Sequence, residues 1–173
     1  MKTQRSRDTF DAARRYSGVY QQQGRMLTDA DWNELADIVK GRLDDVLRDV
    51  VVGGTPRDRG LVRITSAADG TKTYALQWGY AYVDGIVAQA MPKAGTVPQP
   101  LGKNFDYANQ ADFPMAPALP AGNHLLYLDV WERPVLFFED ATLRDPGLHG
   151  ADTCIRTQTM IQVKWCGCGL GRY

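Results

Sequence analysis

The sequence predicts an α+β fold with an extended N-terminal arm, one long amphipathic helix and an antiparallel, β-rich, sandwich-like body. Three observations support this fold class. Apolar residues recur at helical spacing over residues 28–53, and they alternate with period two over residues 74–82. The dipeptide Asp84-Gly85, flanked by apolar residues, predicts a tight hairpin turn of the primed type.

The composition fits a globular domain and gives no general attraction to nucleic acids or membranes. Of the 173 residues, 44% are hydrophobic and 23% are charged, which is ordinary for a domain with a packed core. The 20 basic residues are matched by 20 acidic ones, so we expect neither nucleic acid nor an anionic membrane as a partner. We also expect no membrane span and no secretory signal, because every apolar run is short and the basic N-terminus leads into polar residues.

Residues 1–27 are predicted to form a docking arm. This segment holds six basic and two acidic residues, a net charge of +4, with Phe10, Tyr16 and Tyr20 interleaved. Gly18 and Gly24 interrupt any regular element. Because such a segment cannot bury its own apolar surface, we expect it to lie along another surface, either of this chain or of a neighbour.

Residues 28–53 are predicted to form one long helix. Thr28 is the expected N-cap, and Gly53 with Gly54 ends the helix. The segment has seven acidic and three basic residues, a net charge of −4, which favours contact with the arm, within one chain or between symmetry mates. Its apolar stripe comprises Trp32, Leu35, Ala36, Val39, Leu43, Val46, Leu47 and Val50.

Residues 54–165 are predicted to form the β-rich body, and residues 166–173 an irregular tail that is rich in Gly and Cys. Residues 91–123 form a loop that holds six of the nine prolines. Short apolar or alternating segments predict strands at residues 61–65, 74–82, 124–131, 135–138 and 156–165.

No motif in the sequence predicts a metal site or a cofactor. The pattern of Asp29, Asp31 and Asn33 resembles the start of an EF-hand loop, but Glu34 and Lys40 stand where that loop needs Gly and Glu. The potential zinc ligands lack the paired spacing of a zinc knuckle, and reduced thiols are expected instead. These ligands are His124, His149, Cys154, Cys166 and Cys168.

Catalysis is not expected, although one alternative stays open. The chain has no nucleophile elbow and no phosphate-binding loop. Glu132 and the pair Glu139-Asp140 are carboxylates of the kind that a glycosidase uses. The aromatic residues of the segment 74–82 could form a sugar-binding platform. A carbohydrate-binding or glycan-cleaving module that acts on cell surfaces is therefore the alternative function.

Eight segments of the chain resemble DUF6519, a family of unknown function encoded among phage-tail and contractile-injection genes. They are Ser6–Asp11, Tyr16–Arg25, Asp29–Glu34, Tyr127–Arg133, Glu139-Asp140, Gly150–Thr153, Arg156–Thr159 and Gln162–Lys164. Their order and spacing agree with the family from about residue 6 to 165, with departures at Cys154 and Met160. The resemblance implies a structural component of a phage-like tail or contractile injection system, without catalytic activity.

The implied role is a baseplate or tail-fibre attachment module, assembled in the bacterial cytoplasm and carried in a virion or an extracellular injection particle. The expected partners are other baseplate, tail or fibre proteins. A homo-oligomer is also expected, a trimer first and a hexamer second, because part of the apolar surface should meet another subunit. The residues predicted to dock on partners are Phe10, Arg14, Arg15, Tyr16, Tyr20, Arg25, Asp31 and Trp32.

Overall fold

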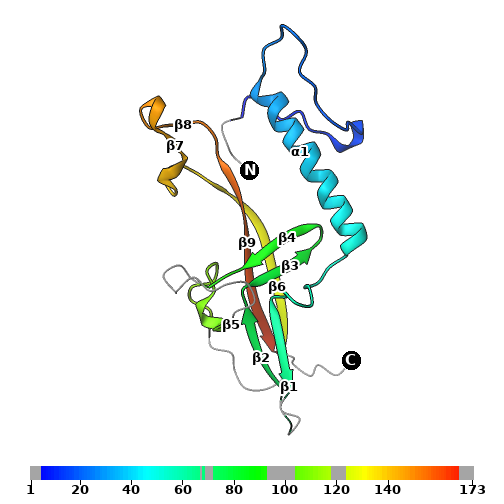
Figure 1. The fold of residues 1–173 in the computed structure, drawn as a ribbon, viewed down its shortest axis with the longest axis vertical. Helices are drawn as coiled ribbons and strands as arrows, with labels where there is room; N and C mark the ends of the chain where they lie inside the picture. The colour runs from blue at the N-terminus through cyan, green and yellow to red at the C-terminus, as the bar shows by residue number, and fades with distance from the viewer. Residues whose placement is uncertain (1–4, 67, 69–71, 93–103, 118–123, 168–173) are drawn as a thin grey trace. The chain divides into compact units, whose positions relative to one another are not determined.

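The computed structural model describes residues 5–66, 68, 72–92, 104–117 and 124–167 (Figure 1). The chain divides into two compact units, residues 1–53 with 84–86 and residues 54–83 with 87–173. In the described part of the chain, no helix combines the length and the apolar character needed to cross a membrane. The dipeptide Asp69-Gly70, whose composition is typical of a turn, and residues 168–173 of the predicted tail lie outside the described residues.

The predicted long helix is present in the N-terminal unit. Helix α1 spans Asp29–Val46, and a π-helical turn, η2, continues it over Leu47–Val51. Thr28 caps α1 as predicted: its hydroxyl accepts the backbone N–H of Asp31 at 3.2 Å and donates to the Asp31 carboxylate at 2.7 Å. The backbone then turns at Val52, whose φ of 63° and ψ of −144° end the helical path.

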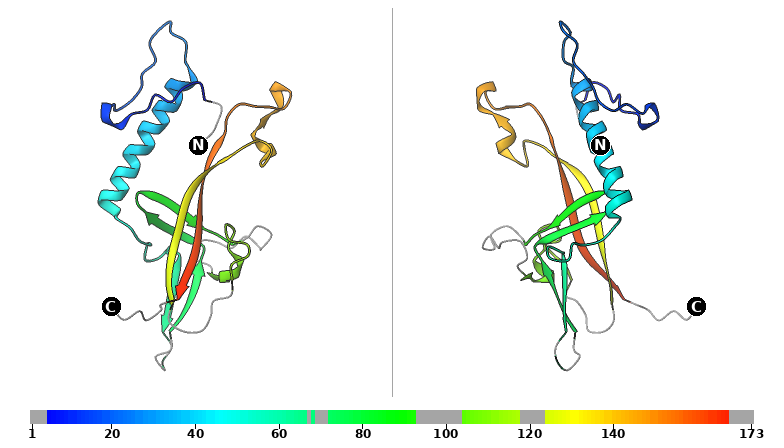
Figure 2. Two further views of the ribbon diagram at one scale, coloured as in Figure 1. Left: turned by 180° about the vertical axis from the view of Figure 1, so that it is seen from behind. Right: turned by 45° about the vertical axis from the view of Figure 1, so that its right-hand side comes forward.

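In its described part, residues 5–27, the arm makes one short regular element, the 3₁₀ helix η1 at Ala12–Arg14. Asp11 caps η1 by accepting the backbone N–H of Ala13 at 2.9 Å. After η1 the chain loops out and returns to the first turn of α1, as the blue segment of Figure 2 shows. The arm of this chain therefore lies along the helix of the same chain, one of the two arrangements that its charge predicts.

The described residues of the second unit form antiparallel strands in four small sheets, so the α+β class is confirmed. The predicted sandwich-like packing of these sheets stays a prediction. One sheet has the order β1-β2-β5, and the others are the pairs β3-β4, β6-β9 and β7-β8. The strands are β1 Val62–Ser66, β2 Lys72–Gln77, β3 Gly79–Val83, β4 Ile86–Ala90, β5 Asn104–Phe105, β6 His124–Val135, β7 Arg144–Asp145, β8 Ala151–Asp152 and β9 Arg156–Gly167.

The alternating segment 74–82 is two strands and not one. The break is at Trp78: β2 ends before this residue, β3 begins after it, and the two strands belong to different sheets. A Cβ at Gly79 would lie 2.6 Å from the carbonyl oxygen of Arg59, and the Tyr80 N–H donates to that same oxygen at 2.8 Å. The close approach of this distant backbone ends the first strand, and the period of the sequence does not reveal it.

The other strand predictions agree with the structure except after Val135. Asp84 and Gly85 both have positive φ, 48° and 83°, as a type I′ hairpin turn requires. The segment predicted before Pro134 continues through it as strand β6, which ends at Val135 and pairs with β9 from His124↔Gly167 to Val135↔Arg156. Residues 136–138, also predicted as strand, enter a turn instead, in which the Leu136 carbonyl oxygen accepts the Glu139 N–H at 2.9 Å. This ribbon twists along its whole length (Figure 2). Cys154, one of the potential zinc ligands, lies in the coil between β8 and β9.

Among the described residues of the second unit, seven buried ones form the hydrophobic core: Leu61, Leu76, Ala81, Ala88, Ala90, Ile161 and Val163. Part of the predicted Pro-rich loop covers the edge of β9 beside this core. Asp112 accepts the N–H of Ile161 at 2.8 Å, and the amide oxygen of Gln110 accepts the N–H of Val163 at 2.7 Å. These two side chains satisfy β9 backbone groups that β6 leaves unpaired.

Candidate protein-docking site

The start of the arm is fastened to α1 through its carboxylates. Ser6 donates its backbone N–H and its hydroxyl to the two carboxylate oxygens of Asp29, at 3.0 and 2.7 Å. Thr9 donates its hydroxyl to Glu34 at 2.6 Å, and Arg5 forms an ion pair with Asp37 at 3.6 Å. We call these contacts of residues 5–10 the clamp.

The hydrogen bonds of the clamp lower the pKa of Asp29. The pKa of its carboxyl lies below the ordinary value, first because the Ser6 hydroxyl donates to it and then because the Ser6 N–H does so. Ala30 and Ile38 of α1 are buried. Helical geometry places both near the clamped carboxylates and opposite the apolar stripe. The arm thus covers the polar face of α1.

Residues 14–27, which we call the docking loop, project from α1 between the clamp and the helix N-cap (Figure 2). Tyr16 and Leu27 are more than half exposed, and the exposed fractions reach 91% for Tyr20 and 85% for Met26. Exposed aromatic and Met side chains next to basic residues are typical of protein-protein contact surfaces.

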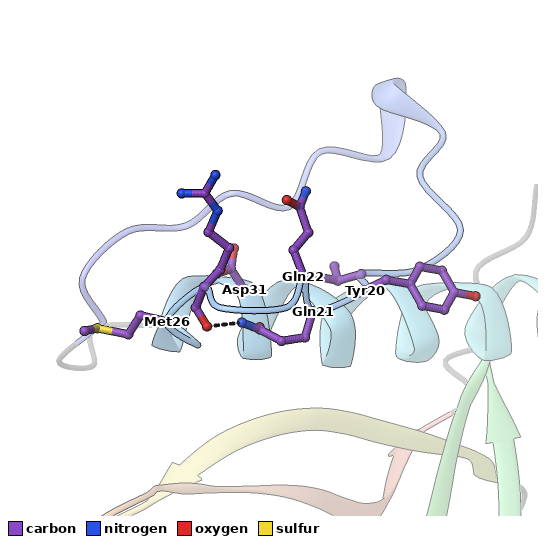
Figure 3. Close-up of a pocket in the computed structure, with 7 residues that line it drawn as sticks. Tyr20, Gln21, Gln22, Met26 and Asp31 are labelled. Carbon is purple, nitrogen blue, oxygen red and sulfur yellow. Dashed lines mark hydrogen bonds between the residues drawn. The ribbon is translucent and has the colours of Figure 1, made fainter.

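The docking loop surrounds an open hollow with a volume of about 410 Å³. Figure 3 shows its side chains on the loop and on the first turn of α1. The Gln21 amide donates to the carbonyl oxygen of Arg25 at 2.7 Å and holds the loop closed. The lining residues are Val19, Tyr20, Gln21, Gln22, Arg25, Met26 and Asp31. This mixture of a phenol, amides, an Arg and a carboxylate suits a polar protein contact.

The structure brings together three of the predicted docking residues, Tyr20, Arg25 and Asp31, which line the hollow. Tyr16 lies elsewhere on the docking loop, and Trp32 lies on the apolar stripe of α1, where both are more than half exposed. The eight predicted residues therefore do not form a single cluster. Their docking role stays a prediction.

The remaining predicted residues are partly engaged within the arm. The ring of Phe10 faces α1, where a Cβ at Gly41 would lie 3.6 Å from it. Arg14 pairs with Asp11 at 3.6 Å, and Arg15 ends η1 with a left-handed φ of 57°. Phe10 thus belongs to the clamp region more than to the exposed loop.

Sequence reasoning missed the residues that build the clamp and most of the hollow. The sequence does not distinguish Ser6 and Thr9, because hydroxyl residues are ordinary in polar segments. The opposite charges of the arm and the helix indicated only that these two elements lie in contact. Nor does the sequence single out Gln21, Gln22 and Met26, because their position at the hollow depends on how the loop closes.

The apolar stripe of α1 is largely exposed. Trp32, Val39, Leu43 and Val46 have exposed fractions between 55% and 62%, and Val50 reaches 76%. A row of apolar side chains this exposed is unusual for the surface of a monomer. It is a second candidate contact surface of the N-terminal unit.

The carboxylates of the alternative glycosidase hypothesis take part in local structure. Glu139 pairs with Arg133, and Asp140 caps the 3₁₀ helix η4, Ala141–Leu143, by accepting the N–H of Thr142 at 3.0 Å. The pKa of Asp140 is lowered, first by the hydroxyl of Thr142. Among the described residues, no three His, Cys, Asp or Glu side chains gather as a metal site would need.

The comparisons with known proteins identify a family. A model of DUF6519, a family of unknown function, matches residues 1–169. No curated protein and no solved structure matches the chain. The match covers the arm, α1 and all the described strands, and it agrees with the resemblance of the sequence motifs.

Proposed function

Because the chain belongs to DUF6519, a family of unknown function, we propose that it is a structural attachment module of a phage-like tail or contractile injection particle. In this proposal it is a non-catalytic component of the baseplate or the tail fibre. The genomic setting that the motif resemblance implies supports the choice of particle. The module is made in the bacterial cytoplasm and leaves it within the assembled particle.

The observation that carries this proposal is the exposure of the docking loop. Tyr16, Tyr20 and Met26 stand in solvent on a segment that also bears Arg14, Arg15 and Arg25. The clamp holds the base of this loop against α1, so less conformational entropy is lost when a partner binds. Rigid aromatic side chains beside Arg are the residues that dominate binding energy at protein interfaces.

The chemistry of the loop indicates the kind of neighbour that it fits. Its Arg side chains select a surface rich in carboxylates, and Tyr20 and Met26 select an apolar pocket on the same surface. Another baseplate, tail or fibre protein would supply both. The balanced charge of the whole chain supports a protein partner over nucleic acid.

Particle incorporation tests the proposal. In the bacterium that encodes the protein, the chromosomal copy would be replaced by a triple variant, Tyr16→Ser, Tyr20→Ser and Arg25→Ser. We expect at least a tenfold loss of the protein from purified particles, while its cellular amount stays constant. Sedimentation followed by quantitative mass spectrometry measures both quantities. Deletion of residues 1–25 should also abolish incorporation, but it removes the clamp as well.

A matched control comes from the second unit. Phe138 and Leu148 are more than half exposed, and Arg144, which lies between them in sequence, is also exposed. Replacing these three by Ser removes an aromatic, an aliphatic and a basic side chain from the second unit. Incorporation should persist in this control. Normal incorporation of the docking-loop variant would refute the docking role.

A further inference from the structure

One face of α1 repeats apolar residues with the spacing of a coiled coil. We call these residues the seam: Trp32, Ala36, Val39, Leu43, Val46 and Val50. Successive members are separated by four, three, four, three and four residues, which is the alternation of the a and d positions in a heptad. Ala36 and Leu43 occupy a, and Trp32, Val39 and Val46 occupy d, while Val50 follows at the next a position by sequence spacing. Val50 lies in the π-helical turn η2, and the other five lie in α1.

The seam is open from Trp32 onward, because beyond Asp29, which lies one heptad before Ala36, the arm binds a different face of α1. The clamp engages Asp29, Glu34 and Asp37, and Phe10 faces Gly41. At 3.6 residues per turn, Glu34, Asp37 and Gly41 lie on the side of the helix opposite the seam. Every seam residue is exposed, including the small Ala36. The chain thus presents an exposed apolar row with the heptad spacing by which a helix packs against a second copy of itself.

We propose that the seam joins the α1 helices of three copies of this chain in a parallel coiled coil. The choice of side chains favours three strands over two. Parallel dimers prefer β-branched residues at a and Leu at d, whereas Leu at a with β-branched residues at d shifts the preference to trimers and tetramers. The seam has Leu43 at a, between the β-branched Val39 and Val46 at d.

The flanking charges favour the parallel orientation. In an antiparallel pair that matches Leu43 with Val39 of the second copy, Lys40 would face Lys40 and Arg42 would face Arg42. Such like-charge contacts oppose pairing. In the parallel arrangement, Lys40 lies beside Leu35 of the neighbour, and Arg42 lies beside Leu47. Their aliphatic stems then cover apolar side chains while the charged ends reach water.

The trimer deepens the proposed function, since three copies would present three docking loops to a symmetric particle. It is nevertheless a property of the isolated protein. A purified chain that trimerises but is dispensable for incorporation would refute the attachment role alone. A monomeric chain that is incorporated through its docking loop would refute the seam alone.

Light scattering of the purified full-length chain, coupled to size exclusion, tests the trimer. We expect a mass three times the chain mass of 19.2 kDa at micromolar concentration. Leu43→Glu, which places a charge in the middle of the seam, should give a monomer. The matched control is Asp45→Glu, two residues further along the same helix and off the seam, which should stay trimeric. A wild-type monomer overturns the proposal.

A milder variant guards against loss of folding. Leu43→Ala keeps a good helix former, so circular dichroism should show an unchanged helix while the dissociation constant rises at least tenfold. Equal association of Leu43→Ala and the wild type would overturn the role of the seam.

Disulfide cross-linking tests the orientation. With Cys154, Cys166 and Cys168 replaced by Ser, Ala36→Cys should form covalent dimers on oxidation, because equivalent a positions meet in a parallel coil. Asp45→Cys, off the seam, should stay uncross-linked in the same background. Absence of cross-linking at position 36, or equal cross-linking at both positions, overturns the parallel arrangement.

Discussion

Replacing Gln110 by Leu should strongly destabilise the second unit, although the two side chains have nearly the same size. Gln110 is 2% exposed, and its amide makes three hydrogen bonds. The amide nitrogen donates to the carbonyl oxygens of Tyr107 at 2.9 Å and Val163 at 3.1 Å, and the amide oxygen accepts the Val163 N–H at 2.7 Å. Leu can replace none of these bonds.

The magnitude follows from the bonds that are lost. At a net contribution of about 1 kcal/mol for each hydrogen bond, the free energy of unfolding should fall by about 3 kcal/mol. The N–H of the fully buried Val163 would also lose its partner, and leaving such a group unsatisfied raises the cost toward about 5 kcal/mol. Packing changes should add little, because the substitution nearly conserves volume.

Urea denaturation of the full chain measures this loss, and hydrogen exchange at the Val163 amide locates it in β9. The control is Gln22→Leu, which changes an exposed Gln of the docking loop in the same way and should cost less than about 0.5 kcal/mol. A loss below about 1 kcal/mol for Gln110→Leu, with unchanged exchange at Val163, would refute the reasoning about the β9 edge.

Three further predictions concern the clamp, the end of the helix and catalysis. Ser6→Ala should raise the pKa of Asp29 toward 3.8, measured by NMR titration. Since that pKa is lowered in the folded chain, the clamp should be at full strength above pH 3.8 and should weaken as the pH falls through the lowered pKa. An unchanged Asp29 pKa in the Ser6→Ala variant would contradict the role of the Ser6 hydrogen bonds. Val52→Gly should stabilise the chain by about 1 kcal/mol in urea denaturation, because a β-branched residue at positive φ costs more than the added freedom of Gly; net destabilisation would count against the strain. Wild-type chain, Glu132→Gln and Glu139→Gln should show equal background hydrolysis and no binding on a glycan array, and turnover lost in either variant would favour the glycan-cleaving alternative.

Local features of the fold were predictable because their causes lie close together in the sequence. Thr28 and Asp31 form a helix cap across three residues, and Asp84-Gly85 supplies the two positive φ angles of its turn. The strands β6 and β9 follow from alternation that is read residue by residue. The opposite charges of arm and helix also indicated their contact, because electrostatic complementarity is visible in composition alone.

The candidate site was predictable only in part. Tyr20, Arg25 and Asp31 are three of the eight predicted docking residues, and they line one hollow. Phe10 was grouped with them but faces Gly41 of α1. Nothing in the sequence separates an aromatic residue that packs on a helix from one that projects into water, because both lie in the same polar, Gly-interrupted segment.

By itself, the sequence determined the α+β composition, the long helix with its apolar stripe, the basic arm and the family. Only the tertiary structure decided which distant segments meet. The backbone of Arg59 approaches Gly79 and ends β2, and the side chain of Gln110 binds the edge of β9 at Val163, 53 residues further along the chain. It also decided that the arm binds the polar face of α1 and leaves the stripe exposed. The physical reason is that propensity, capping and periodicity act between near neighbours, whereas the filling of a face or an edge depends on segments that only the folded chain brings together.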